Sequence, residues 1–146
     1  MPTLLRKLGW SAHLARQLAR QARFPFATDA HLAHEQSRRV QAMVRHAYHT
    51  VPHYRETIDR LGLQPDAFRS AADLARLPIL ERDVLQRDPE RLTSMAIDVR
   101  DRLTLRTGGS TGAPRAVHHS TRSIVENAAH GERERSIIAT ALGQQV

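Results

Sequence analysis

Apolar residues recur with helical spacing through the first hundred residues of the chain. Between residues 29 and 51 they fall at positions i, i+3, i+4, i+7, i+8 and i+11, which is one face of an α-helix. Thr28 and Asp29 are suitable N-caps, and Pro52 both ends this helix and suits the first position of the next. The pattern predicts a long helix with one buried side. Its stripe consists of Val40, Met43, Val44, Ala47, Tyr48 and Val51.

Other helices are expected before and after this one. A helix over 3–23 places Leu4, Leu8, Leu14 and Leu18 at near-helical spacing, and Phe24-Pro25-Phe26 breaks it. A helix that begins at Pro52 carries Tyr54, Ile58 and Leu61 and stops at Gly62. Shorter helical turns are predicted from Ser70 (with Asp73 as a weak capping-box partner) to Leu77, over 81–87, and from Asp88.

The period changes at residue 101. In DRLTLRT, Leu103 and Leu105 alternate with polar residues, as in a half-buried strand, and PRAVHH is a candidate second strand. Ser120 or Thr121 can then cap a helix over about residues 121–142. Between the two strands lies RTGGSTGAPR, residues 106–115. We therefore expect an α/β protein, mainly helical, with a β-hairpin that carries a glycine-rich loop and is followed by a helix.

Composition narrows the class of protein. The chain has 146 residues, 40% hydrophobic and 25% charged, which is typical of one globular domain. Because it has no cysteine, a disulfide scaffold, a thiolate metal site and a cysteine nucleophile are excluded. No apolar run approaches the ~20 residues that cross a bilayer, and no secretory leader is recognisable, so a cytoplasmic location is expected.

The net charge of +7 is concentrated in the first part of the chain. Residues 1–60 hold ten Lys or Arg against four Asp or Glu, and no acid precedes Asp29. The helix over 3–23 can dock on the rest of the protein, lie on an anionic membrane surface, or serve in targeting. An alternative function follows: a small basic helical protein that binds nucleic acid or an anionic membrane. Its cations would be Arg6, Lys7, Arg16, Arg20, Arg23, Arg38, Arg39 and Arg45. Aromatic residues, at 4%, are few for base stacking.

The glycine-rich loop has the chemistry of a phosphate site. Glycines let backbone N–H groups approach phosphate oxygens, hydroxyl groups add donors, and Arg115 adds a forked cation. The loop is not a Walker A motif, because Gly112 is followed by Ala-Pro-Arg, and it does not match the dinucleotide pattern GxGxxG. The alternative is a glycine-rich surface hairpin without a ligand.

Two segments carry a resemblance to a known family. GGSTGAPR resembles the phosphate loop of adenylate-forming enzymes, and the stretch from VRHAYHTVPHYR through SAADLARLPIL resembles the helical N-terminal region of phenylacetate–CoA ligase-like proteins. That group includes adenylate-forming proteins of capsular polysaccharide gene clusters. The similarity runs from about residue 32 to the end, with the loop at the family's usual distance.

The resemblance implies a carboxylic acid–CoA ligase that uses ATP, Mg²⁺ and coenzyme A, forming an acyl-adenylate and then a thioester. The loop would hold the β- and γ-phosphates. Arg115 stands where many members have lysine, but this position varies, so its role is open. The phosphate-binding residues implied are Thr107, Gly108, Gly109, Ser110, Thr111, Gly112, Pro114 and Arg115.

The resemblance covers the N-terminal portion of an adenylation domain. A basic amphipathic helix over 1–28, expected from the leucine spacing and the charges, precedes the region of resemblance. The resemblance implies a helical region over 29–100 and the start of the nucleotide-binding part over 101–146. The adenine, ribose and metal motifs would lie beyond Val146, so no catalytic residue is assigned and the chain alone is not expected to catalyse ligation. The incomplete sheet, with exposed edges and apolar faces, predicts self-association.

Histidines are spaced as metal ligands at two places but make poor sites. His46, His49 and His53 are interrupted by Pro52, and no carboxylate completes the set, while His31 and His34 form only a pair. No metal site is predicted. His118 and His119 follow the loop; one can approach the substrate site, or both can be partly exposed strand residues.

Overall fold

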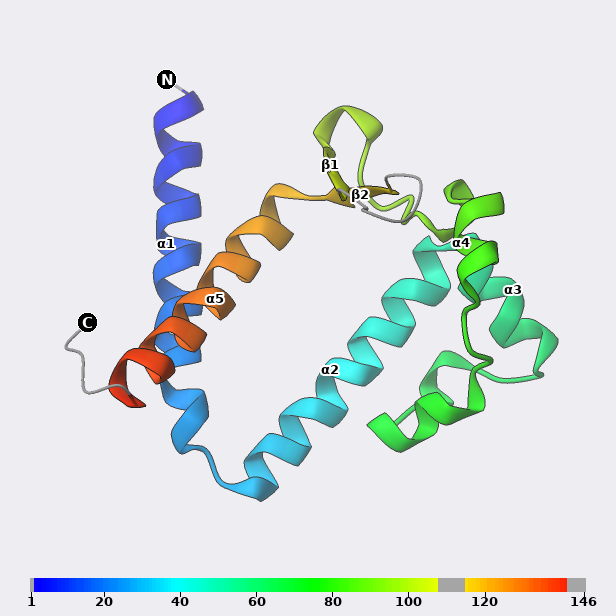
Figure 1. Cartoon of the computed structure of the whole chain (residues 1–146), viewed down its shortest axis with the longest axis horizontal. Coiled ribbons are helices and arrows are strands. Elements are labelled where there is room, and N and C mark those ends of the chain that lie inside the picture. Colours follow the sequence, from blue (N-terminus) through cyan, green and yellow to red (C-terminus); the bar gives the residue numbers. More distant parts are fainter. Residues whose placement is uncertain (1, 108–114, 142–146) are drawn as a thin grey trace. The chain divides into compact units, whose positions relative to one another are not determined.

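The computed structural model of the chain describes residues 2–107 and 115–141, which form two compact units. One unit is continuous and spans 28–98. The other combines the chain up to residue 27 with the chain from residue 99 onward. Figure 1 shows the helices of both units and the β-hairpin.

The continuous unit is built on two successive helices, α2 (Asp29–Thr50) and α3 (Pro52–Arg60), as the apolar spacing predicts. Thr28 caps α2, since its Oγ1 accepts a hydrogen bond from the His31 N–H at 3.3 Å. Pro52 is the first residue of α3. The chain leaves α3 through Gly62, whose φ of 64° lies in the left-handed region that glycine adopts without a Cβ penalty.

The core of this unit is small and lies between α2, α3 and the segment after them. Val40 and Val44 of α2 pack with Ile58 of α3 and with Phe68, and the last two are the largest fully buried side chains of the described residues. Met43 is exposed, although the predicted stripe includes it. The buried face of α2 is therefore narrower than the predicted apolar stripe. Tyr48, Leu63, Leu74 and Leu77 are partly buried around the core.

Short elements complete the unit and are fastened to the two long helices. Arg45 of α2 pairs with Asp66 at 2.7 Å, and the Met95 N–H donates to the carbonyl of Thr50 at 2.8 Å. The turn that begins at Ser70 is a 3-10 helix. The elements are η2 (Pro65–Ala67), η3 (Ala71–Arg76), α4 (Arg82–Arg87) and η4 (Glu90–Leu92).

The other unit pairs the first and last helices of the chain. α1 (Pro2–Arg23) packs against α5 (Thr121–Ala141), and Ala129 of α5 is fully buried. A 3-10 turn, η1 (Phe24–Phe26), ends α1 at the predicted break. Within the described residues, none of the helices combines the length and the apolar character that a membrane span requires. The remaining elements are η5 (Val99–Asp101), β1 (Leu103–Thr107) and β2 (Arg115–His119).

Candidate functional site

The predicted β-hairpin forms, and its register defines where the glycine-rich loop begins and ends. β1 and β2 pair antiparallel, with Leu105 opposite Val117 and Thr107 opposite Arg115. Within the described residues they make a sheet of two strands. The backbone therefore brings the two ends of the loop side by side.

The phosphate-loop residues fall on both sides of the limit of the described structure. Thr107 is the last residue of β1 and Arg115 is the first of β2. Gly108, Gly109, Ser110, Thr111, Gly112 and Pro114 lie outside the described residues. Their role as phosphate ligands stays a prediction.

The hairpin separates Arg115 from the start of the following helix. α5 begins at Thr121, after the end of β2 that is far from the loop. Four strand steps separate Arg115 from His119, which is about 13 Å at ~3.3 Å per residue. Phosphate sites in many nucleotide-binding folds use a helix N-terminus. The N-terminus of α5 lies at the opposite end of β2 from Arg115.

Ser120 caps α5 and so fixes the junction between the hairpin and this helix. Its Oγ accepts from the Ser123 N–H at 3.0 Å, and the Ser123 Oγ accepts from the Ser120 N–H, also at 3.0 Å. The two residues satisfy each other's backbone donors in the manner of a capping box. Of the two caps considered from the sequence, Ser120 is the one used.

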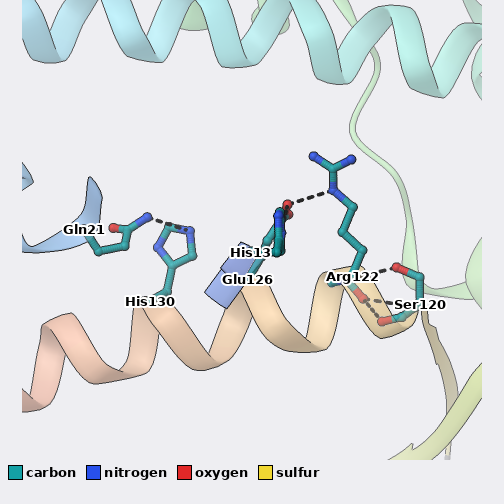
Figure 2. A network of polar contacts seen from close by, with 7 residues as sticks. His13, Gln21, Ser120, Arg122, Glu126 and His130 are labelled. Atoms are coloured by element: carbon teal, nitrogen blue, oxygen red, sulfur yellow. Dashed lines mark hydrogen bonds and ion pairs between the residues drawn. The ribbon is translucent and has the colours of Figure 1, made fainter. Parts of the chain in front are cut away.

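A polar network fastens α5 to α1 (Figure 2). Gln21 of α1 is buried, and its Oε1 accepts from the Arg133 Nη1 at 2.9 Å while its Nε2 lies 3.3 Å from the Nε2 of His130. The Arg133 guanidinium also lies over the Phe24 ring, 5.7 Å from its centroid. Because buried polar groups are costly unless paired, this network favours one alignment of the two helices.

A second contact joins the helices nearer the hairpin (Figure 2). The Nε2 of His13 is buried and lies 3.6 Å from Glu126 Oε1, and it makes no hydrogen bond with a described residue. The same carboxylate oxygen accepts from Arg122 Nε at 2.8 Å. The His13 ring packs edge to face on Trp10 with centroids 5.9 Å apart. α5, which continues directly from the hairpin, is thus held along two turns of α1.

The structure places the two histidines after the loop on opposite faces of β2. His118 pairs across the hairpin with Thr104, and its Nδ1 lies 2.9 Å from the Thr104 Oγ1. His119 lies opposite Leu103. In the described part of the chain, no three His, Asp or Glu residues come together as metal ligands would.

The sequence analysis missed the polar network between α1 and α5. Its α5 members recur at i, i+4 and i+7, namely Glu126, His130 and Arg133, which is a helical face made of polar residues. This spacing is a usable signal. Apolar spacing instead predicts a buried face with the isoleucines of this helix, but Ile124, Ile137 and Ile138 are exposed.

Comparison with known proteins supports the resemblance seen in the sequence. The chain is 36% identical over 91 residues to a phenylacetate–coenzyme A ligase of Aromatoleum evansii and 31% identical over 90 residues to one of Escherichia coli. A third, from Thermus thermophilus, is 29% identical over 90 residues. Each match covers 61% of this chain and 20% of the relative. The chain thus has a partial, phenylacetate–coenzyme A ligase-like relationship and spans about one fifth of these relatives. No protein-family model matches it.

Proposed function

We propose that the chain is the N-terminal part of an AMP-forming carboxylic acid–CoA ligase and that its glycine-rich loop binds the phosphates of ATP. In the complete enzyme the carboxylate of the acid would attack the α-phosphorus, giving an acyl-adenylate and releasing pyrophosphate. The thiol of coenzyme A would then attack the acyl carbon and release AMP. We propose the cytoplasm as the place of this reaction.

The observation that carries the proposal is the hairpin. Its strands end at Thr107 and Arg115 in direct register, so the backbone holds both ends of a segment made of glycine, serine, threonine, alanine and proline. The partial relationship to phenylacetate–coenzyme A ligases supports the same proposed function. The exposed Arg106 at the end of β1 adds positive charge beside the loop.

The role of the loop would be to position and neutralise phosphate oxygens. Backbone N–H groups and the hydroxyl groups of Ser110 and Thr111 can donate to the β- and γ-phosphates, and Mg²⁺ bound to those phosphates would share their charge. Such donors stabilise the leaving pyrophosphate when the bond between the α-phosphorus and the bridging oxygen of the β-phosphate breaks. The acid and its pocket are not assigned to residues of this chain, and we propose that the 146 residues alone do not complete the reaction.

Hydrogen–deuterium exchange of the 146-residue chain tests the phosphate site. ATP with Mg²⁺, and pyrophosphate with Mg²⁺, should each protect residues 107–115, whereas AMP should not, because it lacks the β- and γ-phosphates. The double variant Ser110→Ala/Thr111→Ala should weaken ATP binding about a hundredfold or more, since hydrogen bonds to charged groups contribute ~1.5–3 kcal/mol each.

A matched control replaces the same residue types elsewhere. Ser136→Ala/Thr140→Ala changes two exposed hydroxyl residues of α5 and should leave ATP binding unchanged. Absence of protection by ATP and pyrophosphate at millimolar concentration would refute the phosphate site. Acid-dependent ATP–pyrophosphate exchange by the 146-residue chain would refute its proposed inability to react alone.

A further inference from the structure

α1 has a second apolar face that α5 does not cover. Residues at i, i+4, i+8, i+11 and i+15 share one side of a helix. From Leu4 onward these are Leu4, Leu8, Ala12, Ala15 and Ala19, and all five are exposed. We call them the outer stripe.

The apolar surface of the outer stripe is concentrated in the first two turns. Leu4 is 66% exposed and Leu8 59% exposed, and the neighbouring Leu5 is 74% exposed. The opposite side of α1 carries Trp10, Leu14 and Gln21, which are partly or fully buried. α1 can therefore offer its outer stripe to another surface and keep its contacts with α5.

Cations accompany the outer stripe, without any acid. Arg16, Arg20 and Arg23 follow at i, i+4 and i+7 on the flank of the stripe and are exposed, and Lys7 is exposed near the leucines. α1 contains no aspartate or glutamate. The surface thus carries positive charge beside its leucines and in its last two turns, which is complementary to an anionic partner.

We propose that α1 lies on an anionic membrane surface, with Leu4, Leu5 and Leu8 in the acyl-chain boundary and its arginines on lipid headgroups. A polyanion such as DNA would use the arginines but leave the three exposed leucines in water. A lipid surface satisfies both kinds of residue at once, which is why it is favoured. The helix is about 33 Å long at ~1.5 Å per residue and would lie parallel to the surface.

Vesicle binding by the 146-residue chain tests the proposal. The chain should sediment with phosphatidylcholine vesicles that contain phosphatidylglycerol and much less with phosphatidylcholine alone. Binding should fall as salt is raised towards ~1 M, where the Debye length is ~3 Å. Equal binding to neutral vesicles, or no binding to anionic ones, would overturn the proposal.

Variants in α1 separate the apolar contribution from the charged one. Leu4→Ala and Leu8→Ala should each lower the partition coefficient roughly tenfold, since each removes three carbons that are largely exposed. Arg16→Gln and Arg23→Gln should each lower it about fivefold, while Arg16→Lys and Arg23→Lys should retain binding. An unchanged partition coefficient in the leucine or the glutamine variants would contradict the proposed orientation.

Ile79 provides the matched control. It is 86% exposed in the other unit, so Ile79→Ala removes a comparable apolar surface outside α1 and should not change binding. Trp10 fluorescence, the only tryptophan signal of the chain, checks that each α1 variant keeps its fold.

Other partners of the outer stripe give distinct results. Tight binding to duplex DNA that Leu4→Ala and Leu8→Ala leave unchanged, without vesicle binding, would replace the membrane with nucleic acid. A dimer in light scattering that these two variants dissociate, again without vesicle binding, would make the stripe a contact between copies. Either result would overturn the proposal.

Discussion

Phe68 is the residue on which the stability of the continuous unit most depends. Its ring is fully buried and packs with Val40, Val44 and Ile58, although Phe68 itself lies outside any helix. The guanidinium of Arg76 covers the ring, 5.6 Å from its centroid. Phe68→Ala removes the ring from the point where α2, α3 and the following segment meet.

The expected loss is large compared with the stability of the unit. Burying a phenylalanine contributes about 1.5–3 kcal/mol, and the cavity left by truncation raises the total loss to about 3–5 kcal/mol. At 0.05–0.15 kcal/mol per residue, a unit of this size has a free energy of unfolding of roughly 4–11 kcal/mol. Phe68→Ala should therefore remove about a quarter or more of this free energy, and Phe68→Leu should cost only about 1–1.5 kcal/mol.

Urea unfolding with residue-specific probes measures this effect. Both tyrosines, Tyr48 and Tyr54, lie in the continuous unit, and the single Trp10 lies in the other. With m of ~1–3 kcal/mol/M, the tyrosine-detected midpoint should fall by about 1 M or more in Phe68→Ala. The control Phe26→Ala removes a ring that is 89% exposed and should change stability by less than about 0.5 kcal/mol. A Phe68→Ala loss below about 1 kcal/mol, or an equal loss in the control, would refute the proposed core.

Three further changes are predicted. Gly62→Ala should cost about 1 kcal/mol in urea unfolding, because φ is 64° although no atom lies within 4 Å of the added Cβ, and Gly62→Asn should cost less. The pKa of Asp73 is lowered, chiefly by the hydrogen bond from the Ser70 hydroxyl and then by backbone N–H groups. The contribution of this carboxylate to the free energy of unfolding is therefore present above the ordinary aspartate pKa and is lost as the pH falls through the pKa of the folded state. Asp73→Asn should weaken this dependence of stability on acid in urea titrations at several pH values, and a profile identical to that of the unchanged chain would contradict it. Gln21→Leu should destabilise the helix pair by about 1–3 kcal/mol in Trp10-detected unfolding, because Arg133 loses its acceptor, whereas a neutral effect would mean that water replaces the amide.

Strong local signals made the helices and the hairpin predictable. The bounds of α2 follow from a stripe of apolar residues between the Thr28 cap and Pro52, and the hairpin follows from alternation around Leu103 and Leu105. Phe68 could not be found in this way, because a buried residue in an irregular segment has no periodicity. Its burial depends on how the chain returns to α2 after Gly62, which is a tertiary property.

The hairpin that borders the candidate site was predictable from the sequence, whereas the packing of α5 on α1 was not. The strand ends Thr107 and Arg115 are where the sequence places them, and the binding role of the residues between them stays a prediction. The contact of α5 with α1 was not expected, because its residues are polar or small, such as Gln21 and Ala129. Polar contacts between helices depend on complementary partners, and one helix alone does not reveal its partner.

The hydrogen bond between the Gln21 amide and the Arg133 guanidinium also determines which nitrogen of the His130 ring carries the proton. Arg133 can only donate, so the oxygen of the Gln21 amide must face it and the NH₂ group must face His130. The Nε2 of His130 is then an acceptor, and the ring proton belongs on Nδ1. The pairing of two helices that are more than a hundred residues apart in the chain thus selects one of the two imidazole tautomers, and the ¹⁵N chemical shifts of the ring would report when the pairing is lost.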